Sequence, residues 1–150
     1  MGHTLVICVG NQARGDDGVA HRVARLLGPE PGGDARLLAV TALDVTLAPD
    51  VAEAGFLIVV DAVRRAAPPA AVTALVPGKV DLGGHSLDAA GLLGVARAVY
   101  GRAPKAALVS VAAPEMSHAE GLSSVAEAAA SDAAGLVRTL IDDTIAGQRA

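Results

Sequence analysis

The fold of this chain is decided by the stretch Leu5-Val6-Ile7-Cys8-Val9-Gly10-Asn11-Gln12-Ala13-Arg14-Gly15-Asp16-Asp17-Gly18-Val19-Ala20. It opens with a continuous apolar run of strand length, which is typical of a central strand buried on both faces. The run breaks at Gly10, two aspartates follow, and apolar residues then recur at helical spacing from Val19 to Leu27. The stretch predicts a strand, a tight loop and a helix. Such a loop lies at the carboxyl end of its strand, where ligands bind in open α/β sheets.

The charge of this loop separates it from a phosphate-binding loop. Gly10 and Gly15 have four residues between them, as the glycines of a phosphate loop do, but Asp16 and Asp17 stand where that loop carries its lysine and its serine or threonine. Two carboxylates would repel a polyphosphate and attract a cation. We interpret the loop as a site for a cation or for proton chemistry.

Composition predicts a packed single domain. Of the 150 residues, 52% are hydrophobic and 19% charged, so we interpret residues 1–150 as one globular domain. A net charge of −4 with 1% aromatic residues offers neither a basic surface nor stacking rings for nucleic acid. The single cysteine, Cys8, fits a reducing cytoplasm, and no stretch has the features of a signal peptide or a membrane span. We expect a cytoplasmic protein with no membrane partner, either a monomer or a weak homo-oligomer.

Strands and helices are expected to alternate, which predicts a largely parallel sheet of about five strands between two helical layers, a three-layer α/β sandwich. The expected strands are Thr4–Val9, Ala35–Leu43, Phe56–Val60, Ala71–Val76 (an edge strand) and Ala106–Val111.

Helices are expected after the first strand, around Leu47–Glu53, after Ser86 and near the carboxyl terminus. Capping residues mark three of their starts: Asp16, Ser86, and Ser123 or Ser124. The inner face of the third helix is expected to carry Leu87, Leu92, Val95, Ala96 and Val99. That of the last is expected to carry Val125, Ala129, Leu136, Leu140 and Ile141.

Three residues form a candidate site. Asp17 follows the first strand and Asp61 ends the third, so parallel pairing would place both carboxylates at one edge of the sheet, and His85 lies in a loop that could fold over this edge. Two carboxylates and an imidazole suit nickel or zinc, with coordination positions left open for a substrate. Each residue also has a structural interpretation: a first-turn acid, a turn cap and a loop histidine, respectively.

The other candidate groups are weaker. We expect His21 to be solvated on the first helix and Cys8 to be a core residue without an activated thiolate, while His3 and His118 lie in a terminus and a loop. The sequence contains neither a G-x-S-x-G elbow nor an H-E-x-x-H motif, so conventional serine and zinc-protease sites lack their parts.

Four segments resemble the [NiFe]-hydrogenase maturation protease family. Val9-Gly10-Asn11 with Gly15-Asp16-Asp17-Gly18-Val19 is similar to the family's G-N-x-x-x-x-D-D-G-V opening, and Leu57-Ile58-Val59-Val60-Asp61-Ala62 to its L-I-I-V-D-A strand. His85-Ser86-Leu87 followed by Leu92-Leu93 is similar to its H-x-L…L-L segment, and Glu120-Gly121-Leu122-Ser123 to its late G-L-S. The resemblance spans nearly the whole chain.

The resemblance implies a three-layer α/β sandwich of the phosphorylase/hydrolase-like type. It also implies a cytoplasmic endopeptidase that removes a C-terminal extension from a hydrogenase large-subunit precursor, recognising nickel already inserted in that substrate. The nickel-binding and catalytic positions of the family fall on Asp17, Asp61 and His85. A metal-polarised carbonyl or metal-activated water is the expected route of peptide hydrolysis.

Two departures from the pattern point to a divergent subgroup. Ala20 stands where the family usually has glycine, and Val40-Thr41-Ala42-Leu43 stands where many members carry D-G-G-T. Ala48-Pro49-Asp50-Val51-Ala52 instead resembles the T-P-E-L-A stretch of such a subgroup. Two alternatives stay open: a non-catalytic accessory protein that binds nickel or the precursor, and a different hydrolase on a similar sheet, such as one resembling peptidyl-tRNA hydrolase.

Overall fold

A five-stranded sheet forms the centre of the computed structural model, which describes residues 2–80, 87–117 and 120–149. The strands lie in the order β2-β1-β3-β5-β4. Four are parallel, and β4 pairs antiparallel with β5 at one edge. This confirms the predicted, largely parallel sheet with its edge strand. The strand bounds are β1 Thr4–Val9, β2 Arg36–Val40, β3 Phe56–Val63, β4 Ala70–Leu75 and β5 Lys105–Ala112.

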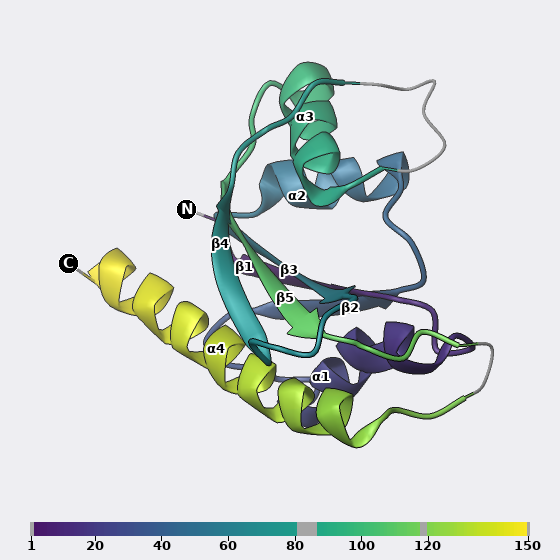
Figure 1. Ribbon diagram of the computed structural model, residues 1–150. Coiled ribbons are helices and arrows are strands. Elements are labelled where there is room, and N and C mark those ends of the chain that lie inside the picture. Colours follow the sequence, from purple (N-terminus) through teal and green to yellow (C-terminus); the bar gives the residue numbers. More distant parts are fainter. Residues whose placement is uncertain (1, 81–86, 118–119, 150) are drawn as a thin grey trace.

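Helices cover both faces of this sheet, which confirms the three-layer sandwich (Figure 1). Helices α1 (Val19–Leu27) and α4 (Ser124–Arg149) pack on one face, and α2 (Ala48–Glu53) and α3 (Ala89–Tyr100) on the other. Two short 3₁₀ turns, η1 (Gly15–Gly18) and η2 (Val45–Leu47), precede α1 and α2. Within the described ranges, no helix is long and apolar enough to cross a membrane.

The continuous apolar sequence of β1 is explained by these two layers. Val6 and Cys8 belong to the core beneath α1 and α4, whereas Leu5 and Ile7 belong to the core beneath α2 and α3. All four side chains are fully buried, because alternate residues of a strand point to opposite faces of the sheet.

The strand order changes direction at β1. From β1 the chain crosses to β2 on one side and then returns to β3 on the other side of β1. The carboxyl ends of β1 and β3 therefore flank a topological switch point, the place where open α/β sheets bind ligands.

Some predicted boundaries were wrong. Strand β2 ends at Val40, and β3 continues two residues past Asp61 to Val63. Helix α3 begins after Asp88, whose Oδ1 accepts a hydrogen bond from the Gly91 amide (2.7 Å), so Asp88 is its N-cap in place of the predicted Ser86. Ser86 itself lies outside the described residues.

The buried face of α4 consists mainly of alanine. Ser123 caps the helix, as predicted, because its Oγ accepts a hydrogen bond from the Ala126 amide (3.2 Å). Val125 was wrongly assigned to the inner face: 41% of it is exposed, and Val99 of α3 is also exposed. Small side chains let α4 lie close to the sheet and α1. The buried residues of α4 are Ala126, Ala129, Ala130, Ala133, Ala134, Val137 and Ile141.

Candidate functional site

The turn after β1 folds back so that Asp17 meets the end of its own strand. A Cβ atom at Gly10 would lie 2.0 Å from the Asp17 carbonyl oxygen, so the turn requires glycine at this position. Asp17 lies in η1 and is half-buried, and its Oδ2 accepts a hydrogen bond from the Asn11 amide at 3.1 Å. The backbone of the loop thus holds one oxygen of the Asp17 carboxylate.

Asp61 lies beside the end of β1, inside β3. It is in register with Val9 of β1 and with Ser110 of β5, and its side chain is half-buried. Burial raises the pKa of the Asp61 carboxyl above its ordinary value, a hydrogen bond from the Ala62 amide opposes that rise, and the charge of Asp17 adds to it. The structure therefore brings the two predicted aspartates together at the switch point.

Asp61→Asn is expected to raise the melting temperature of the metal-free protein by a few degrees at pH 7. A raised folded-state pKa means that the folded protein binds this proton more tightly than the unfolded chain. The bound proton therefore stabilises the folded wild-type protein. This stabilisation is fully present below the unfolded-chain pKa, near 4 for aspartate, and it is lost as pH rises through the folded-state pKa. Asparagine carries no charge at this position at any pH, so it avoids the cost of ionising a poorly solvated carboxyl.

Thermal unfolding of wild type and variant across pH tests this expectation. The gain in melting temperature of Asp61→Asn over wild type should shrink toward pH 3. The control is Asp34→Asn, which changes an exposed carboxylate before β2 and should produce no comparable gain. An Asp61→Asn protein that melts below wild type at pH 7 would contradict the expected destabilising charge.

Asp16 has a structural role that differs from the predicted helix cap. No side-chain hydrogen bond caps η1 or α1. The Asp16 carboxylate is fully buried and accepts hydrogen bonds from the Glu115 amide (2.9 Å), the Ser123 amide (2.7 Å) and the Ser123 hydroxyl (2.7 Å). The Asp16 amide donates to the Glu115 carbonyl (3.0 Å). Asp16 thus fastens the turn that carries Asp17 to the loop before α4.

The third residue of the predicted site, His85, lies outside the described residues, as does His118. Among residues 2–80, 87–117 and 120–149, no group of three or more His, Cys, Asp or Glu side chains is arranged to hold a metal ion. The described part of the site is the Asp17–Asp61 pair, and its completion by His85 stays a prediction.

No family model and no curated protein matches this sequence. Solved structures do match it. The hydrogenase maturating endopeptidase HybD from E. coli is 24% identical, with a TM-score of 0.79 over 95% of this chain and 93% of that chain. The [NiFe] hydrogenase maturation protease HycI from Thermococcus kodakarensis is 19% identical, with a TM-score of 0.70 over 94% and 93%. An endopeptidase from E. coli is 26% identical, with a TM-score of 0.70 over 90% and 89%.

The fold is that of the hydrogenase maturation endopeptidases. These matches confirm the resemblance that the four sequence segments predicted, and they cover nearly all of each chain. At these identities they establish a shared fold, so the reaction and its substrate are matters for proposal.

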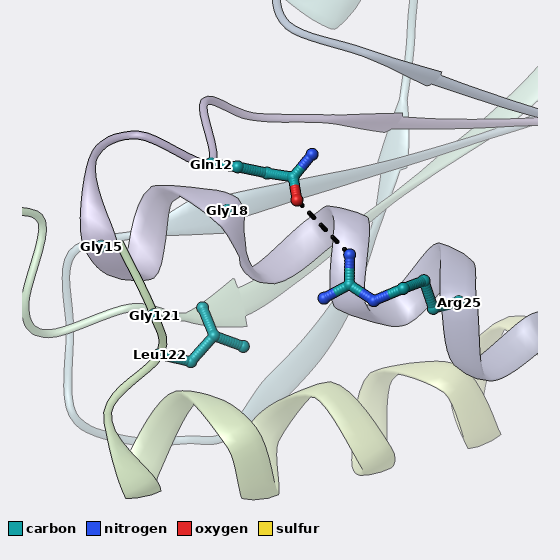
Figure 2. A pocket seen from close by; sticks show the side chains of 6 residues that line it. All are labelled: Gln12, Gly15, Gly18, Arg25, Gly121 and Leu122. Atoms are coloured by element: carbon teal, nitrogen blue, oxygen red, sulfur yellow. Dashed lines mark hydrogen bonds between the residues drawn. The ribbon is translucent and has the colours of Figure 1, made fainter. Parts of the chain in front are cut away.

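On this hydrogenase maturation endopeptidase fold, His21 reaches from α1 to the carboxyl ends of β1 and β2. Its side chain is half-buried, so the prediction of a solvated histidine was wrong. The ring Nε2 lies 2.7 Å from the Gly10 carbonyl oxygen and 3.2 Å from that of Val40, and Nδ1 lies 3.3 Å from Gln12 Nε2. Figure 2 shows Gln12 and Arg25 pointing toward one another across a pocket of about 60 Å³ beside this loop, with Arg25 donating to Gln12 Oε1 (3.4 Å).

Arg65 adds a cation near the same edge of the sheet, and sequence reasoning missed it. Its Nη2 donates to Ser110 Oγ (3.0 Å) and to the Ser110 carbonyl (3.3 Å), and its Nε donates to the Pro68 carbonyl (3.0 Å). Ser110 is the register partner of Asp61, so Arg65 is anchored one strand away from the aspartate pair. In the sequence, only its position four residues after Asp61 indicated that Arg65 could lie near the candidate site.

Cys8 is a core residue, as predicted. It is fully buried between the sheet and the α1/α4 layer, and burial raises the pKa of its thiol to about 12. A thiol in this state is protonated at neutral pH and is a poor nucleophile.

Proposed function

We propose that this chain is a cytoplasmic endopeptidase of hydrogenase maturation that removes the C-terminal extension of a [NiFe]-hydrogenase large-subunit precursor. In this proposal, Asp17, Asp61 and His85 contact nickel carried by the precursor. The observation that carries the proposal is that Asp17 and Asp61 both lie at the β1/β3 switch point of a fold shared with hydrogenase maturation endopeptidases.

The donor set fits a borderline divalent cation. Carboxylates and an imidazole are ligands that nickel and zinc accept, and three protein ligands leave positions for substrate groups. Burial and the Asp17 charge disfavour the ionised form of Asp61, and a cation between the two carboxylates would offset both effects. The bound metal would supply a Lewis acid for the scissile carbonyl or for an attacking water.

The protein's own groups hold this arrangement rigidly. Asp17 is oriented by the Asn11 amide, and the turn that carries it is fastened through Asp16 to the loop before α4. Asp61 is fixed by strand pairing on both sides. In this proposal, Arg65, which is held by Ser110 and Pro68, attracts carbonyl or carboxylate oxygens of an incoming peptide.

Processing of a nickel-loaded precursor tests the proposal. Wild-type protein is expected to shorten the precursor, and Asp17→Ala, Asp61→Ala and His85→Ala are each expected to abolish detectable cleavage while keeping the fold. Mass spectrometry of the precursor would locate the cut, and circular dichroism would verify folding. Asp34→Ala, which changes an exposed carboxylate in the turn before β2, is the matched control and should cleave normally. Unimpaired cleavage by Asp17→Ala and His85→Ala would contradict the proposal.

The same assay tests the accessory-protein alternative. An accessory protein would bind the nickel-loaded precursor without shortening it. Binding without cleavage by the wild-type protein would therefore replace the peptidase assignment with this second function.

A further inference from the structure

One peptide group of the loop is held from both sides. The carbonyl of Gly10 accepts a hydrogen bond from His21 Nε2 at 2.7 Å. The amide of the same peptide group, that of Asn11, donates to Asp17 Oδ2 at 3.1 Å. The Gly10–Asn11 peptide group therefore links the His21 ring to the Asp17 carboxylate through one hydrogen bond on each side.

The hydrogen bonds assign the tautomer of His21. Both partners of Nε2 are carbonyl oxygens, which only accept, so Nε2 carries the ring proton. Nδ1 then accepts from the Gln12 amide, whose Oε1 in turn accepts from Arg25 (Figure 2). This chain runs from the exposed Arg25 to the backbone of the loop and keeps the ring in one orientation.

The same ring proton also fastens the loop to the sheet. The Val40 carbonyl accepts from His21 Nε2 at 3.2 Å and from the Gly10 amide at 3.0 Å. The end of β1 is thereby tied to the end of β2 at the point where the loop departs. Gly10 has no side chain of its own, so the His21 ring supplies the side-chain contact that anchors the loop at this point.

We infer that His21 is a positioning residue of the site: through the Gly10–Asn11 peptide group it directs the Asp17 carboxylate. One oxygen of Asp17 is held by the Asn11 amide, and within residues 2–80, 87–117 and 120–149 no hydrogen bond to the other oxygen is found, which leaves it for a cation. Groups that orient a ligand in this way tune metal affinity without touching the metal. The inference rests on the proposed function only in taking Asp17 as a metal ligand.

The test compares His21→Leu, which removes the ring donor, with His21→Gln, whose amide can restore it near the position of Nε2. Arg22→Gln is the matched control, because Arg22 is the next residue of α1 and pairs instead with Glu127 of α4 (2.8 Å). Amide hydrogen exchange of Asn11 is measured without metal, with Ile58 of the buried β3 as the reference for global unfolding. Nickel is then titrated into each protein.

Relative to Ile58, exchange of the Asn11 amide is expected to become about tenfold faster in His21→Leu. It should return toward wild type in His21→Gln and stay unchanged in Arg22→Gln. Nickel affinity should fall about ten- to a hundredfold in His21→Leu and recover in His21→Gln. Unchanged Asn11 exchange in His21→Leu would overturn the inference. Faster Asn11 exchange together with a wild-type protein that binds no nickel would support the positioning role and count against the proposed metal site alone.

Discussion

Asp16→Ala is expected to lower the free energy of unfolding by at least about 3 kcal/mol. The Asp16 side chain is fully buried and accepts three hydrogen bonds, two of them from backbone amides of the loop before α4. Alanine would leave these donors of part-buried hydrogen bonds without their acceptor, and a hydrogen bond to a charged group contributes about 1.5 to 3 kcal/mol. Urea unfolding followed by circular dichroism measures the loss.

Two further variants sharpen the comparison. Ser123→Ala removes the hydroxyl that bonds Asp16 and caps α4 but keeps the Ser123 amide, so a smaller loss of about 1 kcal/mol is expected. Asp132→Ala removes an exposed carboxylate of α4 and should stay within about 0.5 kcal/mol of wild type. An Asp16→Ala protein as stable as Asp132→Ala would show that the buried network does not hold the turn.

The sequence predicted the elements whose signal is local. Strand β1 was predicted with its observed bounds because five apolar residues follow Thr4 without interruption and both faces of the strand are buried. The place of Asp17 and Asp61 at one sheet edge also followed from parallel pairing, since β1 and β3 are neighbours. The last residues of β3 were missed because the backbone pairs with β5 as far as Val63, regardless of side-chain polarity.

Long-range contacts account for the other errors. Asp16 was interpreted as a local cap because its partners, Glu115 and Ser123, lie 99 and 107 residues away in the sequence. His21 was interpreted as solvated because its acceptors are backbone carbonyls of Gly10 and Val40, which no residue pattern reveals. In α4, the buried face begins at Ala126, so Val125 lies outside it despite being the more apolar residue.

Nickel affinity is expected to rise with pH, by up to about tenfold per pH unit while Asp61 is being deprotonated, and to level off once it is ionised. Burial and the charge of Asp17 raise the pKa of Asp61, so the metal-free protein retains this proton above the ordinary aspartate range. A cation that binds both carboxylates must displace it. Calorimetric titrations in buffers with different ionisation enthalpies would count the protons released.

Two variants assign the released proton. In His85→Gln any proton from that imidazole is removed, so the release that remains belongs to the carboxylate pair. Asp61→Asn has no proton to lose at this position and should lose both the release and most of the affinity, because its neutral amide replaces an anionic ligand. Nickel binding that is independent of pH and unaffected by Asp61→Asn would place the metal elsewhere. Without metal, the same Asp61→Asn protein should nevertheless be more stable than wild type. The reason is that the half-buried charge of Asp61 destabilises the metal-free protein, although the cation needs this charge as a ligand.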